Sequence, residues 1–344
     1  MRKEKDMATL RDIAERAQVS IATVSLYLNG KSKGRISEST MQKIKNAIDE
    51  LQYQPTKSKA LLHHLETEDR QRTIAVYWAS DARASLLGKV MAGLQECILK
   101  EGMSHLTIII RPYKINELYK EKELLLPRYY DGVIISNTTS LDMQYLDSVQ
   151  LPMPAVLLNR RSDRYSTVTL DNRGMGEQIA RMMKDRGIPS VAVFRTMNPY
   201  LAVNQRLMGF IDGCRALRIQ IPNEAQFIVE NSVEGGMEAA RRYLTLQQQP
   251  KAIFADNDLL AMGALSAFYK QGFRVPEDAA LISIGQYAFS SVRCTIPALT
   301  TLDVPLQSLA YHCLKLLGEL LYTKKSGPLH QQIEPELHMR ESFV

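Results

Sequence analysis

The sequence of 344 residues predicts an α/β protein in which a small three-helix head precedes a two-lobed core of parallel sheets. One observation is a change of hydrophobic period: helical spacing prevails in the first 62 residues, and from Arg72 onward short apolar runs alternate with amphipathic segments. The other is the position of the charge. Residues 1–62 hold 12 Lys and Arg against 7 Asp and Glu, which is five of the six net positive charges. A basic head on a balanced core predicts a polyanionic partner for the head alone.

The composition is that of an ordinary globular protein, with 45% hydrophobic and 23% charged residues. No apolar run reaches the roughly 18 residues that a membrane span needs, and the charged start lacks the apolar stretch of a secretory signal, so we expect a cytoplasmic protein. Four scattered cysteines form no C-x-x-C pair and are expected to be buried packing residues in a reducing compartment. They are Cys97, Cys214, Cys294 and Cys313.

Three short segments of the head have helical periodicity. The first begins at a capping-box pattern of Thr9 and Asp12, the second runs from Ser20 to Asn29, and the third begins at Ser37. A short turn makes the first two helices cross steeply, as in a helix-turn-helix unit, and frees the outer face of the second for a DNA groove. That face carries Ile21, Ala22, Ser25 and Leu26. A plain three-helix bundle is the alternative.

A hinge is expected to follow the head. Tyr53-Gln-Pro55 ends the head at residue 55, because the residue before a proline is pushed away from helical geometry. Residues 56–71 then form the hinge and linker. Its first part has good helix formers but is too short to be stable alone, so we expect it to order only on a partner. A solvated linker is the alternative.

Residues 72–344 are expected to form the core, with a first lobe of residues 72–168 and 302–325 and a second of residues 169–301 and 326–344. Ligands of such folds bind beyond the carboxyl ends of the strands. The expected strands cover 73–78, 106–110, 132–136, 155–158, 191–194, 252–255 and 280–284. The expected helices cover 86–101, 174–186, 203–217, 235–246, 259–271 and 305–322.

The head sequence LRDIAERAQVSIATVSLYLNG, followed by RIS, a helix and LQYQP, resembles the DNA-binding head of the lactose-repressor (LacI/GalR) family of bacterial transcription regulators. The core continues this resemblance in six segments. They are LDNRGMG (170–176), RLMGF (206–210), FADNDLLAMGAL (254–265), GFRVPEDAALISIG (272–285), IPALTTL (296–302) and PELHMRES (335–342).

The resemblance implies a core like that of the type I periplasmic binding proteins. It also implies a sequence-specific repressor of carbohydrate-utilisation genes, which binds a near-palindromic operator in double-stranded DNA as a homodimer. A small-molecule effector, a sugar or a sugar derivative, would bind in the cleft between the lobes.

Several head residues match positions that contact DNA in this family. Ile21, Ala22 and Leu26 match residues that read base edges, and Leu62 matches a leucine that the hinge inserts into the minor groove. Leu26 is a departure, because the family commonly has an arginine there, and leucine cannot donate a hydrogen bond to guanine. The complete expected DNA-binding set is Thr9, Ser20, Ile21, Ala22, Thr23, Ser25, Leu26, Asn29, Tyr53, Lys57, Lys59 and Leu62.

The expected effector-binding residues lie in the loops after the core strands. Arg206 and Asn257 match effector contacts of the family, although an ordinary salt bridge is the alternative for Arg206. At Tyr287 the family has a carboxylate, and its loss leaves open a different sugar, a phosphorylated or anionic compound, or a nucleobase. The expected set is Asp81, Arg83, Asn159, Arg206, Asn257 and Tyr287.

No catalytic or cofactor motif stands out. The six histidines lack metal-ligand spacing, and a nucleophile elbow, a Walker A loop and a dinucleotide fingerprint are all missing. We therefore expect no enzyme, no cofactor and no metal site; a Rossmann-like enzyme would need one of these motifs. Two alternatives remain, a solute-binding sensor and a regulator controlled by a protein partner. The C-terminal segment has no leucine heptad, which favours dimers over tetramers.

Overall fold

The computed structural model describes residues 10–28, 36–51, 71–80, 84–197, 200–285, 287, 291–322 and 327–344. The chain divides into two compact units, Met1–Gln71 and Arg72–Val344. This division falls at the residue where the hydrophobic period of the sequence changes. The expected hinge helix lies outside the described residues.

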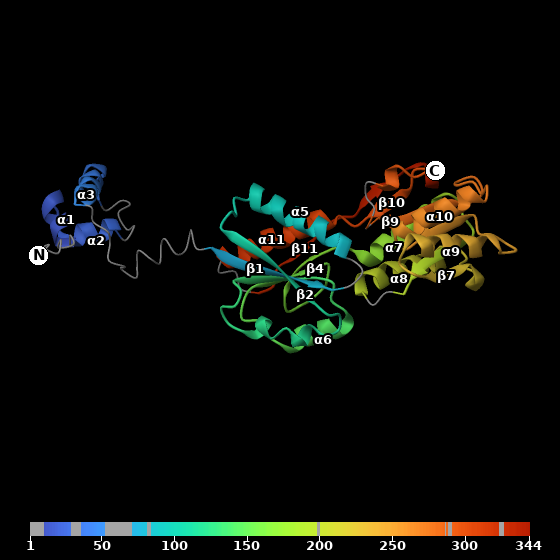
Figure 1. Cartoon of the computed structure of the whole chain (residues 1–344), viewed down its shortest axis with the longest axis horizontal. Coiled ribbons are helices and arrows are strands. Elements are labelled where there is room, and N and C mark those ends of the chain that lie inside the picture. The colour runs from blue at the N-terminus through green and yellow to red at the C-terminus, as the bar shows by residue number, and fades with distance from the viewer. Residues whose placement is uncertain are drawn as a thin grey trace, which may run out of the picture. The chain divides into compact units, whose positions relative to one another are not determined.

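The first unit is the expected helix-turn-helix head (Figure 1). It contains α1 (Leu10–Ala17), α2 (Ile21–Leu28) and α3 (Glu38–Glu50). Gln18 takes a φ of 57° in the short turn between α1 and α2, and an ion pair of 2.5 Å joins Arg16 of α1 to Glu50 of α3. Six small or branched apolar residues form the buried core, namely Ile13, Ala14, Ala17, Val24, Ile44 and Ala47.

The first lobe of the second unit is built on a six-stranded parallel sheet of order β11-β5-β4-β3-β1-β2. Helices α5 and α11 cover one face, and α6 with two short 3-10 helices covers the other (Figure 1). The strands are β1 (Arg72–Ala79), β2 (Leu106–Tyr113), β3 (Gly132–Ile135), β4 (Ala155–Leu158), β5 (Ser166–Thr169) and β11 (His330–Gln332). The helices are α5 (Ala84–Lys100), α6 (Ser140–Ser148) and α11 (Leu306–Tyr322), and the 3-10 helices are Leu118–Lys120 and Lys122–Leu125.

The second lobe repeats this plan with a sheet of order β12-β10-β9-β8-β6-β7, in which only β12 runs antiparallel to its neighbour. Helices α7 and α8 cover one face, and α9 and α10 cover the other. The strands are β6 (Val191–Thr196), β7 (Gln226–Val229), β8 (Ala252–Ala255), β9 (Ala280–Gly285), β10 (Thr300–Asp303) and β12 (Glu336–His338). The helices are α7 (Asn172–Asp185), α8 (Leu201–Ala216), α9 (Val233–Leu244) and α10 (Asp258–Lys270), and the 3-10 helices are Asn223–Ala225, Ser291–Arg293 and Glu341–Phe343.

Three connections cross between the lobes: β5 to α7, β10 to α11, and β11 to β12. Three expected boundaries were therefore wrong. Thr169 belongs to β5 and pairs with Gln332 in the first sheet, so the first lobe continues past residue 168. All of β10 pairs in the second sheet, so the first lobe resumes after Asp303 rather than at residue 302. Residues 330–332 were assigned to the second lobe, but they pair with β5 of the first, because the chain stays in the first lobe after α11 and crosses only after β11.

The sequence analysis missed β5, β7, β10, β11, β12 and α6. These elements are short, and β11 has the polar sequence HQQ, so they give little periodic signal. One cysteine also differs from expectation. Cys97, Cys214 and Cys313 are buried, whereas Cys294 is exposed beside the 3-10 helix that starts at Ser291. Among the described residues, no helix is both long enough and apolar enough to cross a membrane.

Helices α7 and α8 approach each other closely because glycines lie at their contact. A Cβ atom on Gly176 of α7 would collide with the carbonyl oxygen of Arg206 and the backbone nitrogen of Phe210, both in α8. Gly209 of α8 is placed in the same way against the carbonyl oxygen of Arg173. Backbone atoms cannot give way as a flexible side chain can, so this contact fixes the position of the first turns of α8.

Gly176→Ala is expected to lower the free energy of unfolding of the core by about 2–3 kcal/mol, because the added methyl group forces the two helices apart. The matched control is Gly88→Ala in α5, where a Cβ meets open space. There alanine should raise stability by up to about 1 kcal/mol, since glycine disfavours a helix. Denaturant unfolding of both variants measures these changes, and equal effects at the two positions would contradict the close contact.

Candidate functional site

The outer face of α2 presents the residues expected to read DNA. Ile21 is 50% exposed and Ala22 is exposed, whereas Ser25 and Leu26 are half-buried. Val24 on the opposite face is fully buried and anchors the helix in the head core. The outer face is therefore small, apolar and hydroxyl-bearing, which suits contact with base edges better than contact with phosphates.

The N-terminus of α2 is capped as expected. Ser20 Oγ accepts a hydrogen bond from the backbone N–H of Thr23 at 3.1 Å and lies 2.8 Å from the Thr23 hydroxyl oxygen. Six expected DNA contacts lie outside the described residues: Thr9, Asn29, Tyr53, Lys57, Lys59 and Leu62.

The described part of the head carries little of its positive charge. Residues 10–28 and 36–51 hold four basic and five acidic side chains. The positive excess therefore lies in the flanking segments 1–9, 29–35 and 52–62, of which 29–35 alone holds three basic residues and no acidic one. The positive charge of the head and the face of α2 expected to read DNA therefore lie in different segments.

In the second unit, a narrow cavity of about 30 Å³ lies between the lobes. The carboxyl ends of β1, β3 and β4 line it from the first lobe, and the first turns of α8 line it from the second. Its described lining contains two arginines and no carboxylate. The lining residues are Trp78, Leu86, Asn137, Leu158, Asn159, Arg160, Tyr200, Ala202, Val203, Arg206, Val304 and Leu306.

A wider cavity of about 430 Å³ adjoins the narrow one and shares Asn159 and Arg160 with it. Arg161 and Arg173 also line it, against a single carboxylate, that of Asp171. This carboxylate caps α7, because its Oδ1 accepts the backbone N–H of Gly174 at 2.9 Å. Together the two cavities give a cleft large enough for a small molecule.

Two asparagines in left-handed conformation shape the first-lobe side of the cleft. Asn137 follows β3 with a φ of 58°, and Asn159 follows β4 with a φ of 53°. Asparagine is among the few non-glycine residues that adopt this conformation readily. Asn159 Oδ1 accepts hydrogen bonds from the backbone N–H of Leu170 at 3.2 Å and from Asn172 Nδ2 at 2.8 Å. It therefore holds the connection from β5 to α7.

The arginine of the first lobe is held by oxygens of neighbouring loops. Arg160 is 6% exposed, and its Nε donates to the Thr138 carbonyl oxygen at 3.0 Å and to the Thr138 hydroxyl at 2.9 Å. Its Nη1 donates to the Asn159 carbonyl oxygen at 2.6 Å. These bonds fix the guanidinium at the end of β4.

The arginine of the second lobe connects to the same network. Arg206 is 3% exposed, and its Nη1 donates to Asn172 Oδ1 at 3.1 Å. Because Asn172 also donates to Asn159, one amide links the loop after β4 to α8 across the cleft. An ordinary exposed salt bridge, the alternative for Arg206, does not fit this burial.

A buried carboxylate lies near Arg206. Asp256 Oδ2 accepts hydrogen bonds from the backbone N–H and the hydroxyl of Thr196 at 2.7 and 3.0 Å, and Oδ1 accepts one from Asn257 Nδ2 at 2.7 Å. Burial raises the pKa of Asp256 to about 6, while these hydrogen bonds and the charge of Arg206 act in the opposite direction. The carboxylate thus titrates close to neutral pH.

Two expected effector residues have other partners. Asn257 is 4% exposed and caps α10: its Oδ1 accepts the backbone N–H of Leu260 at 3.1 Å. The backbone N–H of Tyr287 donates to the Asp258 carboxylate at 2.9 Å, and its hydroxyl accepts from Asn231 Nδ2 at 3.2 Å. Neither Asn257 nor Tyr287 lines the two cavities of the cleft.

Of the expected effector residues, the structure therefore brings Asn159 and Arg206 together, and Asp81 and Arg83 lie outside the described residues. The expected set omitted four polar lining residues: Trp78, Asn137, Arg160 and Tyr200. Signals for them existed. Trp78 is the single tryptophan and ends the first expected strand, and Asn137 follows the third.

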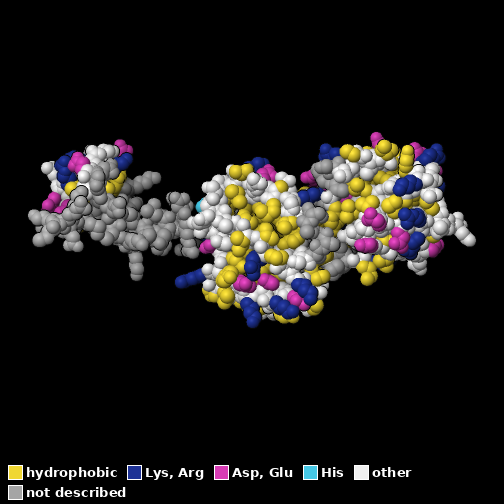
Figure 2. Space-filling view, in the orientation of Figure 1, with side chains coloured by type: hydrophobic (Ala, Val, Ile, Leu, Met, Phe, Trp, Pro, Cys, Tyr) yellow, Lys and Arg dark blue, Asp and Glu magenta, His cyan; other side chains and the backbone are white. Residues whose placement is uncertain are grey.

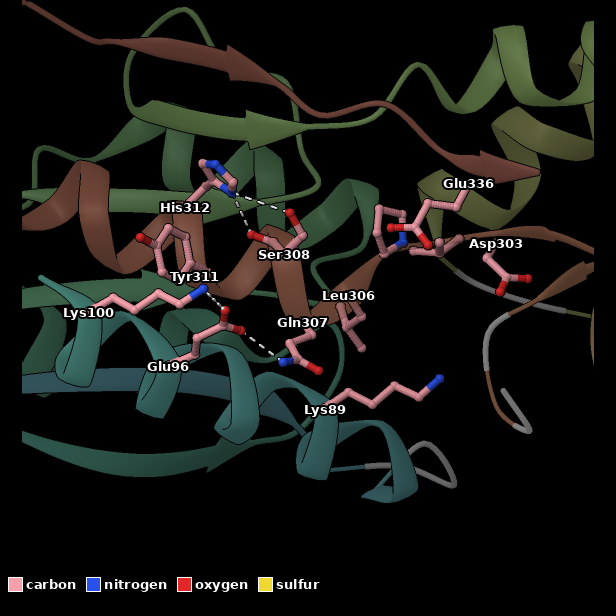
Figure 3. A pocket seen from close by; sticks show the side chains of 12 residues that line it. Lys89, Glu96, Lys100, Asp303, Leu306, Gln307, Ser308, Tyr311, His312 and Glu336 are labelled. Carbon is pink, nitrogen blue, oxygen red and sulfur yellow. Dashed lines mark hydrogen bonds and ion pairs between the residues drawn. The ribbon is translucent and has the colours of Figure 1, made fainter. Parts of the chain in front are cut away.

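A third cavity, of about 490 Å³, lies between α5 and the start of α11 (Figure 3). Glu96 joins the two helices there, because its carboxylate accepts from Lys100 Nζ at 2.6 Å and from Gln307 Nε2 at 2.9 Å. Burial lowers the pKa of Lys89, while Asp258 and Asp303 counteract this. Three carboxylates and two lysines line this cavity, and Glu96 is already paired with Lys100, so we assign it no ligand. In the described ranges, no cluster of His, Cys, Asp or Glu could hold a metal ion.

Family comparisons match both units. A family model described as "Bacterial regulatory proteins, lacI family" matches residues 9–56, and one described as "Periplasmic binding protein-like domain" matches residues 180–343. The crystal structure of a LacI family transcription regulator from Clostridium acetobutylicum is 30% identical with a TM-score of 0.75, over 78% of this chain and 99% of that one.

Two curated relatives extend the similarity along the chain. The probable HTH-type transcriptional repressor ExuR of Bacillus subtilis is 28% identical over 310 residues, covering 88% of this chain and 89% of the relative. The HTH-type transcriptional repressor PurR of Mannheimia succiniciproducens is 28% identical over 340 residues, covering 98% of both.

The buried carboxylate predicts a pH dependence of stability. Folded Asp256 keeps its proton up to about pH 6, whereas an unperturbed aspartate releases it near 3.8. Between these values the folded state binds more protons, so this group makes the free energy of unfolding fall as the pH rises. The change should be on the order of 3 kcal/mol, at about 1.36 kcal/mol per pKa unit.

Denaturant unfolding of the wild type and of Asp256→Asn at pH 4, 5, 6 and 7 isolates this contribution, because other groups titrate alike in both proteins. The wild type should lose stability relative to the variant from pH 4 to 6, and the difference should level off above pH 6. A difference that does not vary with pH would show that Asp256 has an ordinary pKa.

Proposed function

The chain belongs to the lacI family of bacterial regulatory proteins, and on that premise we propose that it is a sequence-specific transcriptional repressor controlled by a small molecule between its lobes. The observation that carries this proposal is the exposed outer face of α2 in a helix-turn-helix head. Relatives of nearly the same length are named repressors, which supports repression over activation. The genes proposed as targets are those for carbohydrate use.

The proposed mode of DNA binding places α2 in the major groove of double-stranded operator DNA. Ile21 and Ala22 reach base edges near the N-terminus of the helix, and Ser20 holds that turn in place. One head offers few contacts, so two heads bound side by side on two half-sites gain affinity through effective concentration. A homodimer on a near-palindromic operator is therefore part of the proposal.

An apolar surface on the first lobe supports pairing of two chains. Figure 2 shows apolar side chains gathered over α5 and β2. On α5, Leu99 is 75% exposed and Met91 is 37% exposed, and β2 is an edge strand whose Ile108 and Ile110 are half-buried. A surface of this kind on an edge strand and a neighbouring helix suits burial against a second copy.

The proposed effector is a sugar or a sugar derivative. Trp78 and Leu86 give the cleft an apolar wall, and Asn137, Arg160 and Arg206 give it polar groups, the combination that binds small polar ligands. Because both lobes contribute, a bound effector favours one arrangement of the lobes over another. That difference in affinity is what control of DNA binding requires.

Selection of a randomised duplex pool with the full chain at low ionic strength tests the proposal. It should enrich an inverted repeat. Enrichment of no sequence would refute specific DNA binding, and enrichment of a single unrepeated half-site would refute the dimer. On the selected operator, Ala22→Glu should lower affinity on the order of a hundredfold, because a carboxylate then faces phosphates and base acceptors. The control Gln42→Glu adds the same charge to the exposed face of α3 and should have a much smaller effect.

The side chain of Leu26 makes a second prediction for the same selection. Leucine has no donor for guanine and instead packs on a thymine methyl group. The base pair that Leu26 faces should therefore be A·T or show no preference in the selected half-site. Leu26→Arg should change the preference at that position alone to G·C. An unchanged consensus with the variant would show that residue 26 does not contact bases.

A further inference from the structure

We propose that the cleft takes an anionic effector, a small polar compound with a carboxylate or phosphate group that lies between Arg160 of the first lobe and Arg206 of the second. This inference rests on the proposed function, because it names the class of effector for the same cleft. The evidence is the chemistry of the lining, the burial of the two arginines and their positions on opposite lobes.

The lining of the narrow cavity offers hydrogen-bond donors. Trp78 Nε1 and Asn137 Nδ2 are buried nitrogen atoms that have no hydrogen-bond partner among the described residues, and both belong to side chains that line it. Asn159 Oδ1, an acceptor on the same lining, already accepts two hydrogen bonds. Buried donors without partners cost free energy, so the ligand that fits best brings acceptor oxygens.

The charge of the lining residues also favours an anionic ligand. Arg160 and Arg206 are 6% and 3% exposed, and the described lining of the narrow cavity has no carboxylate. The carboxylate that acts on Arg206 is that of Asp256, whose oxygens also accept hydrogen bonds from Thr196 and Asn257. A buried guanidinium group is stabilised by a charged partner, and a planar fork suits a carboxylate or phosphate.

The positions of the two arginines explain how an anion would act as an effector. Arg160 is hydrogen-bonded to Thr138 of the first lobe, and Arg206 in α8 is hydrogen-bonded to Asn172 of α7 in the second. An anion between them attracts both guanidinium groups at once, so it binds better when the lobes are close together, and it shifts the protein toward that arrangement.

The proposed binding of an anion can be tested in the full chain by tryptophan fluorescence. Trp78 is the single tryptophan and lines the cleft, so its emission reports on binding there. The probes are inorganic phosphate, glucuronate and glucose 6-phosphate, with glucose as the neutral counterpart, all at constant ionic strength. At least one anionic probe should change the emission of Trp78 in a saturable way, and glucose should bind at least tenfold more weakly. Comparing glucuronate with glucose 6-phosphate shows which charged group the cleft prefers.

Arg160→Gln and Arg206→Gln should each weaken the saturable change by tenfold or more. Arg206→Lys keeps the positive charge but not the planar pair of guanidinium N–H donors, and it should lower the affinity for the anionic probe less than Arg206→Gln does. Arg181→Gln is the control, since Arg181 is an exposed arginine on α7 and should bind as the wild type does. Circular dichroism and thermal unfolding establish that each variant is folded.

Three results would overturn the inference: no saturable response to any anionic probe, glucose binding as tightly as the anions, or equal affinities of the wild type and both glutamine variants. Duplex selection is carried out on the same preparation. If that selection enriches an operator while the anions fail, the proposed repressor stands and only the class of effector is wrong. If the anions bind but no duplex is enriched, the repressor itself is wrong.

Discussion

The hydrogen bonds of Asn172 join the two lobes at the cleft, and the candidate effector site depends on them. Its Nδ2 donates to Asn159 Oδ1 at 2.8 Å, and its Oδ1 accepts from Arg206 Nη1 at 3.1 Å. Asn172 is 5% exposed, and its Nδ2 also donates to the Leu170 carbonyl oxygen at 3.3 Å, so loss of either partner removes one hydrogen bond from a buried amide, at a cost of about 0.5–1.5 kcal/mol. One side chain therefore sets both the arrangement of the lobes and the orientation of Arg206.

The backbone contact between α7 and α8 fixes the position of the Asn172 side chain relative to Arg206. Gly176 lets α7 lie directly on the carbonyl oxygen of Arg206, so Asn172 and Arg206 belong to one rigid platform in the second lobe. Asn159 and Arg160 are fixed in the first lobe by neighbouring loops. Separation of the lobes therefore requires the hydrogen bond between Asn159 and Asn172 to break. A ligand that binds both lobes adds to the contact that already joins them. A modest binding energy can therefore shift the population toward the arrangement in which the lobes are close together.

The sequence predicted helices and strands well where a segment has several apolar residues at a regular spacing. Strand β1 and helix α10 were expected within a few residues of their bounds, because both have several apolar residues at a clear spacing. Strand β11 was missed because its short sequence HQQ has no apolar period, and its pairing with β5, which lies far earlier in the chain, is not encoded in the local sequence. Periodicity reports which residues are buried, and it does not report which sheet they join.

The candidate site was predicted less completely, for a different reason. Asn257 precedes a helix, and the same residue type at that place serves as a helix cap or as a ligand contact; its amide is bonded within the second lobe. Asn159 and Arg206 were expected, but their partner Asn172 was not, because the bond between the lobes depends on tertiary packing. Trp78 was read as a strand residue, and its indole nitrogen became a candidate only once both walls of the cleft were known.

The head separates affinity from specificity along the chain. Helix α2 has the sequence IATVSLYL with no charged residue, so in the proposed mode of DNA binding its contacts with bases are apolar or involve hydroxyls. The described helices of the head together hold four basic and five acidic side chains, and therefore add little to attraction by phosphates. Electrostatic attraction must then come from the basic flanking segments. In the proposed mode of DNA binding, the salt dependence is therefore set by those segments and the choice of base sequence by α2, so each can change without the other.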